Sequence, residues 1–198
     1  MVVDYLNRAF DVLEYSLRCY RRVFAFRMDL RLPAQPYLDI PNTGQILNRF
    51  IASFKAKVEH SRYQAAKENA YAHQTEVLSI WCKEWSSNGA PHFHFVMLLN
   101  NDAFCTLGKF ELGRDNLYNR LIEAWASALG LTAEDTRGLV QFPENGTYLL
   151  SRESPEVYRD LCYRVSYLCK VETKRYGDRS HNFGASHIKN GRMQRIAV

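Results

Sequence analysis

The strongest constraint on the fold is a pair of apolar runs separated by a short turn sequence. The runs cover residues 77–85 and 92–99, and Ser-Ser-Asn-Gly-Ala at 86–90 stands between them. Asn-Gly in a short polar segment that joins two apolar runs is typical of a β-hairpin. The sequence therefore predicts two neighbouring antiparallel strands near the middle of the chain.

The flanking sequence predicts helices and further strands. Residues 23–32 alternate between apolar and polar or small side chains, which indicates a half-buried strand. Apolar residues at helical spacing predict four helices, and two more short strands are expected. The helices are expected at 1–20, from 43 to about 73, at 117–129 and from 155 onward, and the short strands at 139–142 and 148–150. This order predicts an α+β fold, an antiparallel sheet flanked by helices.

Length and composition fit one compact domain over residues 1–198. The chain is 46% hydrophobic and 24% charged, which excludes a disordered or collagen-like protein. The longest apolar run, residues 95–99, is too short to cross a bilayer, and the N-terminal segment is charged where a signal peptide would be apolar. We therefore expect a cytoplasmic protein without a membrane segment. Five cysteines without a C-x-x-C pair favour reduced thiols.

The positive charge is concentrated at the C-terminal end. The net charge is +5, and the residues from Lys170 onward hold seven cations and two anions, so the rest of the chain is neutral. We expect a basic tail at 175–198, with Lys174 and Arg175 as candidate DNA contacts. Such a segment suits a polyanionic partner, and a solvated basic tail without a partner is the alternative.

Two histidines lie on the second strand of the predicted hairpin. Alternate residues of a strand share a face, so His92 and His94 point the same way, about 7 Å apart along the chain. Two imidazoles placed like this can chelate one divalent ion. Because the pair is a weak motif by itself, the prediction of a metal site depends on a further ligand from the neighbouring strand.

The register of the hairpin decides whether that ligand exists. With a three-residue loop at 87–89, Glu84 lies opposite His92. With a two-residue Asn-Gly turn, Trp85 lies opposite His92 instead, and Glu84 turns to the other surface. The first register is favoured, because the second sets the Glu84 carboxylate opposite Phe93.

The first register predicts the metal ligands. His92, His94 and Glu84 would then share one face, and this donor set with open positions suits Mg²⁺ or Mn²⁺ acting on phosphate. The same register sets Cys82 opposite His94. Cys82 is therefore a competing ligand, and a Zn²⁺ site is the alternative.

The last predicted helix carries phenol and ammonium groups along one stripe. Tyr163, Tyr167, Lys170 and Lys174 follow each other at 4-3-4 spacing, which is the spacing of one helical face. Taken alone, this pattern fits an ordinary solvated surface. A functional role requires that this face look across a cleft at the histidine strand.

The histidine pair and the tyrosine stripe together resemble a known family. His92-Phe-His94 followed by Tyr167-Leu-Cys-Lys170 resembles the HUH endonucleases, which include the rolling-circle replication initiators. The order of histidines before tyrosine resembles the initiators and the single-tyrosine transposases rather than the relaxases. The segments at 24–33, 87–94 and 167–174 are similar to the filamentous-phage (inovirus-type) replication proteins, which also occur in bacterial prophages.

The resemblance implies a fold, an activity and roles for residues. The implied fold is an HUH-type nuclease domain with a ferredoxin- or RRM-like sheet. The implied activity is nicking and joining of single-stranded origin DNA, with Tyr167 as the nucleophile that forms a 5′-phosphotyrosine. Lys170 would orient Tyr167 or contact the phosphate, and Tyr163 is a candidate second nucleophile. We interpret Arg27 and Arg31 as DNA-phosphate contacts, with plain solvent-facing residues as the alternative.

Two other functions stay open. One is an HUH single-tyrosine transposase. The other is a non-catalytic module that binds single-stranded nucleic acid and uses Phe24, Phe26 or Phe93 as stacking platforms. The pattern G-x-x-x-x-G-K-[ST] is absent, so no nucleotide cofactor is expected, and a host helicase and polymerase are candidate protein partners.

Overall fold

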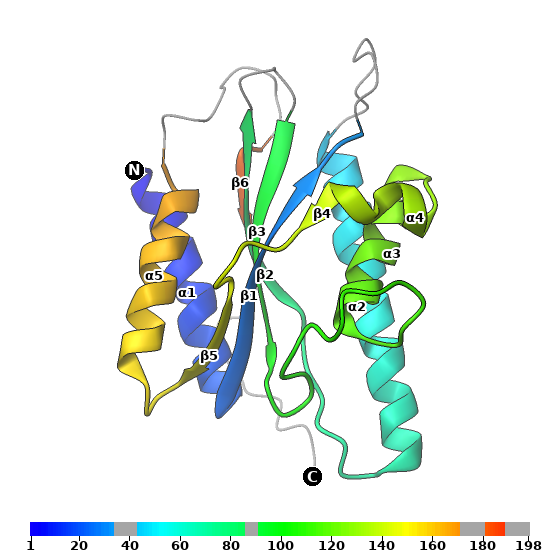
Figure 1. The fold of residues 1–198 in the computed structure, drawn as a ribbon. Coiled ribbons are helices and arrows are strands. Elements are labelled where there is room, and N and C mark those ends of the chain that lie inside the picture. Colours follow the sequence, from blue (N-terminus) through cyan, green and yellow to red (C-terminus); the bar gives the residue numbers. More distant parts are fainter. Residues whose placement is uncertain (34–42, 86–90, 171–180, 189–198) are drawn as a thin grey trace.

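The structure is a computed structural model that describes residues 1–33, 43–85, 91–170 and 181–188 (Figure 1). The predicted helices and strands occur in the predicted order, and three further short elements are present in these ranges. In chain order they are α1 (Val3–Cys19), β1 (Arg22–Arg31), α2 (Thr43–Glu68), β2 (Leu78–Trp85), β3 (Pro91–Asn100), α3 (Leu117–Leu129), α4 (Ala133–Thr136), the 3-10 helix η1 (Arg137–Leu139), β4 (Val140–Gln141), β5 (Thr147–Ser151), α5 (Pro155–Leu168) and β6 (Phe183–Ala185). The predicted α+β fold is confirmed.

The six strands form one antiparallel sheet. Its order is β4-β1-β3-β2-β6, and β5 pairs with β1 beside β4. The predicted hairpin is β2 and β3, and Glu84 lies opposite His92 in their register. The favoured register is therefore confirmed, although the loop at 86–90 lies outside the described residues.

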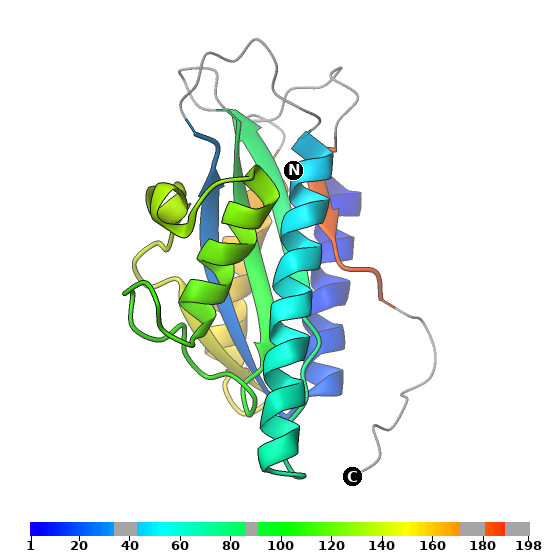
Figure 2. The ribbon, with the colours of Figure 1, turned by 90° about the vertical axis from the view of Figure 1, so that its right-hand side faces the viewer.

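One face of the sheet is covered by α2 and α3, which lie side by side in Figure 2. The alternation in β1 turns Phe24, Phe26, Met28 and Leu30 toward this face, as predicted from the sequence. These side chains meet a dense aromatic core in which the Phe50 ring lies edge-on to Trp125, with ring centroids 5.7 Å apart. We call the face of the sheet that α2 and α3 cover the far face.

The other face is covered by α1 and α5 (Figure 1). Its side chains change from apolar to charged along β1. Where the helices cover it, β1 contributes Val23 and Ala25, and both are fully buried. Farther along the same face, β1 contributes the half-buried Arg27 and Asp29. We call this surface the near face. The prediction of a half-buried strand is therefore wrong for the first part of β1, because helices cover both sides of it.

Helix α5 is shorter than the tyrosine and lysine stripe predicts. It ends at Leu168, because the Cys169 carbonyl accepts the backbone N–H of Val2 at 2.9 Å and the Lys170 N–H bonds back to Tyr167. Lys170 therefore follows the helix instead of lying on its face, and Lys174 lies outside the described residues. The long helix α2 also ends earlier than predicted, at Glu68.

A short strand lies within the segment that the sequence indicates as a basic tail. β6 pairs with β2, and the Phe183 ring stacks on Tyr5 of α1 with centroids 4.5 Å apart. On the other side of β6, a Cβ at Gly184 would overlap the Trp81 indole. A small residue and an aromatic anchor thus fit this strand between α1 and β2.

Within the described ranges, no helix combines the length and apolar character that a bilayer crossing requires.

Candidate metal centre and tyrosine cleft

Three neighbouring strands bring the candidate metal ligands together. His92 and His94 project from β3 on the near face, and Glu84 projects from β2 opposite His92. The register between β1 and β3 places Asp29 opposite His94. Because side chains alternate between faces with a period of two, all four of these residues share the near face.

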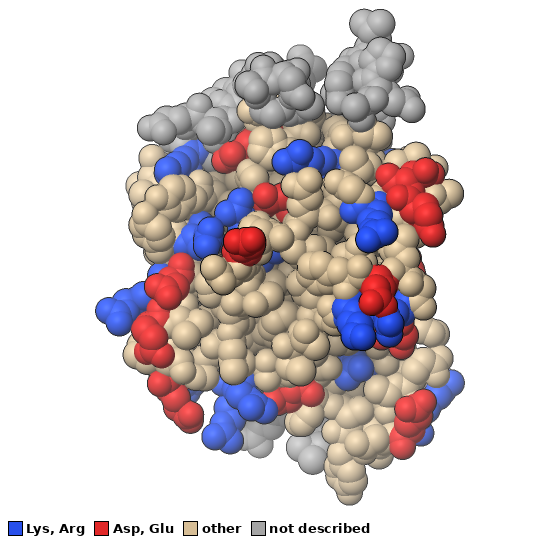
Figure 3. Space-filling view, viewed as in Figure 1, with Lys and Arg blue, Asp and Glu red and all other residues tan. Residues whose placement is uncertain are grey.

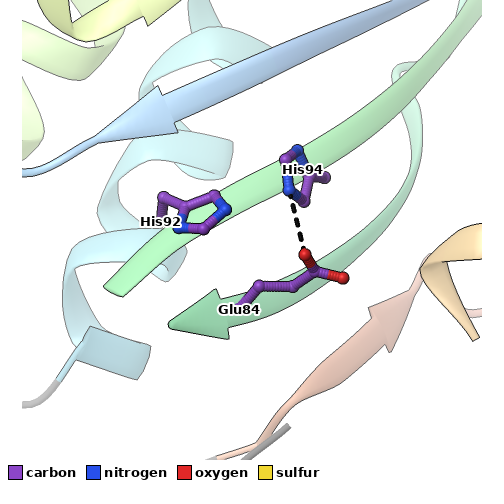
Figure 4. Close-up of side chains that lie close together, drawn as sticks. All are labelled: Glu84, His92 and His94. Carbon is purple, nitrogen blue, oxygen red and sulfur yellow. Dashed lines mark ion pairs between the residues drawn. The ribbon is translucent and has the colours of Figure 1, made fainter. Parts of the chain in front are cut away.

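Glu84, His92 and His94 form a compact donor set (Figure 4). One ligand atom from each residue can be chosen so that all lie within 4.8 Å of one another. The Nε2 atom of His94 lies 3.3 Å from Oε2 of Glu84, and the two imidazole centroids are 4.7 Å apart. Two imidazole nitrogens and one carboxylate oxygen at this spacing can coordinate a single divalent cation.

Asp29 orients His94 from the opposite side. Its Oδ1 lies 2.6 Å from Nδ1 of His94, and both side chains are less than a fifth exposed. Arg27 approaches the same pair, with Nη2 3.4 Å from Oδ2 of Asp29. A carboxylate that accepts the Nδ1 proton leaves Nε2 as the metal-facing nitrogen. No role for Asp29 was predicted from the sequence, where its one signal is an acidic residue on a strand face that it shares with two arginines.

The two histidines have opposite electrostatic tendencies. Burial favours the neutral imidazole of His94, but hydrogen bonds to Asp29 and Glu84 outweigh it and raise the pKa of His94 to about 9. Burial and the neighbouring His94 charge lower the pKa of His92. Burial opposes ionisation of Asp29 too, yet the His94 bond and the Arg27 charge hold the pKa of Asp29 below its usual range. A cation at this site would replace the proton between His94 and Glu84.

Cys82 does not join this donor set. It lies opposite His94, as the favoured register predicts, and its side chain is fully buried among apolar residues of the near face. Among the residues that the structure describes, the one group able to hold a metal ion contains Glu84 and omits Cys82. The thiolate alternative is therefore not supported by the geometry.

A cleft of about 920 Å³ connects the donor set to the tyrosines. Glu84 and His94 line it from the sheet, and Tyr163 and Tyr167 line it from α5. Figure 3 shows basic and acidic side chains interspersed on this part of the surface, where α5 meets the sheet. The functional interpretation of the tyrosine stripe required such a shared cleft, and the structure contains one.

The two tyrosines contact each other directly. Their hydroxyl oxygens lie 2.6 Å apart, and the rings meet edge-on. This hydrogen bond to Tyr167 raises the pKa of Tyr163. Lys170 lies beyond the end of the helix but still contacts Tyr167, with Nζ 3.8 Å from the centroid of the Tyr167 ring.

The predicted DNA contacts fall in different places. Arg27 lines the cleft and contacts Asp29, whereas Arg31 is exposed and lies opposite His92 in the β1–β3 register. Lys174 and Arg175 lie outside the described residues. Arg164 also lines the cleft, and the sequence analysis gave it no role.

The proposed stacking platforms are not accessible. Phe24 is 4% exposed, and Phe26 and Phe93 are fully buried. All three belong to the core beneath α2 and α3 on the far face. They cannot stack on nucleic-acid bases, so this part of the binding-module prediction is wrong.

Comparison with known proteins identifies relatives over nearly the whole chain. The family described as "YagK/YfjJ C-terminal domain" matches residues 1–186. "Uncharacterized protein YagK" of Escherichia coli (strain K12) is 34% identical over 197 residues, which cover 95% of this chain and 94% of the relative. "Uncharacterized protein YfjJ" of the same strain is 31% identical over 193 residues, covering 92% and 93%. No solved structure gives a significant match.

Proposed function

The chain belongs to the YagK/YfjJ C-terminal domain family, and we propose that it is a metal-dependent DNA nicking-joining endonuclease of the HUH type. The observation that carries the proposal is the cleft that Glu84 and His94 share with Tyr163 and Tyr167. A histidine pair or a tyrosine stripe alone fits a structural role. Together in one cleft, they supply a nucleophile and a cation site for the same phosphate.

The donor set fits a divalent cation. His92, His94 and Glu84 offer two nitrogens and one oxygen within 4.8 Å, all three residues are half-buried, and Glu84 and His94 line the cleft. A set of three ligands with open positions that acts on phosphate suits Mg²⁺ or Mn²⁺ better than a structural Zn²⁺, whose sites are closed by four protein ligands. A cation held here would offset the negative charge that develops on the phosphoryl oxygens.

Tyr167 is the proposed nucleophile. Its hydroxyl oxygen loses its proton and attacks phosphorus, the bond from phosphorus to the 3′ oxygen breaks, and the released 3′ oxygen takes up a proton, so the step has no net proton change. The protein then holds a 5′-phosphotyrosine, and the DNA ends in a free 3′-hydroxyl that can prime synthesis. Attack by that hydroxyl on the phosphotyrosine reverses the step and joins strands.

Tyr163 and Lys170 hold Tyr167 in position for this step. The hydroxyl groups of Tyr163 and Tyr167 share a hydrogen bond, and that bond raises the pKa of Tyr163. The ammonium of Lys170 lies over the Tyr167 ring, where the cation and the ring attract each other. Both contacts fix the nucleophile before the substrate enters the cleft.

The proposed biological role is initiation of rolling-circle replication on a phage or prophage-like element. Its substrate would be single-stranded origin DNA, and a host helicase and polymerase would extend the free 3′ end. An HUH single-tyrosine transposase would use the same chemistry on a different target. The two roles differ in the reaction product, because a transposase joins the cleaved strand to a new site.

The proposal is tested by trapping the covalent adduct. The full chain is incubated with circular single-stranded DNA and Mn²⁺, with and without EDTA, and resolved on a denaturing gel. Mass spectrometry then locates the nucleotide on the protein. We expect an EDTA-sensitive adduct on Tyr167 that Tyr167→Phe abolishes. Tyr71→Phe is the matched control, because Tyr71 is 83% exposed and lies outside the cleft lining.

Three outcomes contradict the proposal. An adduct that persists in EDTA argues against the cation site. An adduct on a residue outside the cleft argues against the nucleophile. If circles of varied sequence form no adduct with either Mg²⁺ or Mn²⁺, the nicking activity is rejected, and a non-catalytic role of the cleft becomes the better interpretation.

A further inference from the structure

Arg164 is a cation in the cleft lining to which the proposed chemistry gives no role. It lies on α5 three residues before Tyr167, and its half-buried side chain lines the cleft. Its Nε donates a hydrogen bond to the hydroxyl oxygen of Tyr148 at 3.2 Å. Among the described residues, no carboxylate lies within ion-pair distance of Arg164.

The other two cations of the cleft lining already contact side chains of the site. Arg27 contacts Asp29 and also Nδ1 of His94, at 3.2 Å from Nη2. Lys170 lies over the Tyr167 ring. Arg164 differs, because its Nε is bound to a neutral hydroxyl while its two Nη groups stay available for a ligand. A guanidinium with two free donors matches the oxygens of a phosphate.

Tyr148 makes the position of Arg164 rigid. It belongs to β5 and pairs with Ala25 of β1, so its backbone is part of the sheet. The hydrogen bond from Arg164 ties a flexible side chain of α5 to this strand. A guanidinium that is held before the ligand arrives loses less conformational freedom on binding.

We infer that Arg164, held by Tyr148, forms a phosphate-binding subsite for a backbone phosphodiester of the DNA strand beside Tyr167. The inference rests on the proposed function, which brings a DNA strand into the cleft. An arginine contact to a phosphate positions the strand but reads no base. Arg164 is therefore a positioning residue whose effect on binding is independent of the DNA sequence.

The experiment measures binding of labelled single-stranded oligonucleotides to the full chain in EDTA, where no cleavage is expected. Fluorescence anisotropy gives the affinity over a series of salt concentrations. For Arg164→Ala we expect about tenfold weaker binding to several unrelated sequences. We also expect the slope of log K against log salt to fall by about 0.7, the value of one lost phosphate contact.

Three further variants separate charge from geometry. Arg159→Ala is the matched control, because Arg159 is an exposed cation of the same helix outside the cleft lining, and it should leave the slope unchanged. Arg164→Lys should restore the slope but only part of the affinity. Tyr148→Phe should keep the slope and weaken binding about two- to tenfold, since the charge stays while its anchor is lost.

The results distinguish this inference from the proposed function. The subsite is rejected if a folded Arg164→Ala protein binds with the affinity and slope of the unaltered chain, even if the adduct on Tyr167 forms. If Arg164→Ala changes the slope but no adduct ever forms, the subsite stands and the nicking activity is rejected. If Arg164→Ala does not fold, Arg164→Lys and Tyr148→Phe decide. Failure of the unaltered chain to bind the oligonucleotides overturns the subsite.

Discussion

The two faces of the sheet belong to the same strands but carry different kinds of side chain. On the far face, apolar side chains of β1 such as Phe26 and Leu30 run the length of the strand, and α2 and α3 cover them. On the near face, β1 begins with buried aliphatic residues and continues with Arg27 and Asp29. The change occurs where the cleft begins.

This difference separates the near face into two parts. The aliphatic part stabilises the fold, and the polar part forms the candidate site. Asp29, Glu84 and His94 are each less than a fifth exposed, so they pay a desolvation cost that exposed residues would avoid. Their mutual hydrogen bonds offset that cost in part. A sheet that already has an apolar core on its far face can tolerate such a cluster on the other.

The largest effect is expected from truncation on the far face. Phe50 is fully buried and contacts Phe95 and Trp125 edge-on, so Phe50→Ala should lower the free energy of unfolding by about 3–5 kcal/mol. His92→Ala on the half-buried near face should cost only about 1 kcal/mol. Urea denaturation of both variants measures the contrast. Equal losses of unfolding free energy would show that the polar part of the near face stabilises the fold as much as the aromatic core does.

The next largest effect is expected on the Mn²⁺ affinity of the candidate metal site on the near face. Asp29→Asn removes the carboxylate charge that holds the Nδ1 proton of His94, and Mn²⁺ affinity should fall about 10- to 100-fold. Asp160→Asn is the matched control, because Asp160 is an exposed acid of the same cleft lining. It should change the affinity several-fold at most, through screened charge alone.

Electron paramagnetic resonance of free Mn²⁺ measures both affinities, and thermal unfolding in EDTA checks that the variants fold. An Asp29→Asn protein that binds Mn²⁺ as tightly as the unaltered chain would contradict the orienting role of Asp29. An equal loss in Asp160→Asn would show that the charge of the cleft, and not the hydrogen bond to His94, sets the affinity.

Local sequence signals were enough to predict the hairpin and the candidate metal ligands on it. A turn sequence and a period of two are properties of neighbouring residues, so they predict the hairpin and reduce its register to two alternatives. The favoured one, with Glu84 opposite His92, is confirmed. The amphipathic helix at Leu117–Leu129 and its end at Gly130, which has a φ of 71°, are local in the same sense.

The parts that the sequence did not reveal depend on contacts between distant segments. Asp29 and His94 are 65 positions apart in the sequence, and no local pattern predicts which strand pairs with β1. Helix α5 ends where the backbone of Val2 reaches Cys169. Strand β6 is only three residues long and depends on Phe183 packing against Tyr5 of α1. Periodicity cannot predict such elements, because tertiary contacts decide them.

The smallest effect is expected at the edge of the cleft, where the two tyrosines meet. Tyr163→Phe removes the hydrogen bond to the Tyr167 oxygen at 2.6 Å but keeps the ring contact. Tyr163 is exposed, so water can replace the lost hydrogen-bond partner. We expect the adduct to form on Tyr167 at a rate reduced about tenfold at most, the range of one neutral hydrogen bond.

Mass spectrometry of the adduct and a time course on a denaturing gel test this prediction together. Tyr163→Phe and Tyr167→Phe remove the same atom from the two ends of one hydrogen bond, so any effect of the bond itself is common to both. Only loss of the nucleophile abolishes the adduct. If Tyr163→Phe abolishes it in a folded protein while Tyr167→Phe retains it, the nucleophile is Tyr163, and the roles of the two phenols are exchanged.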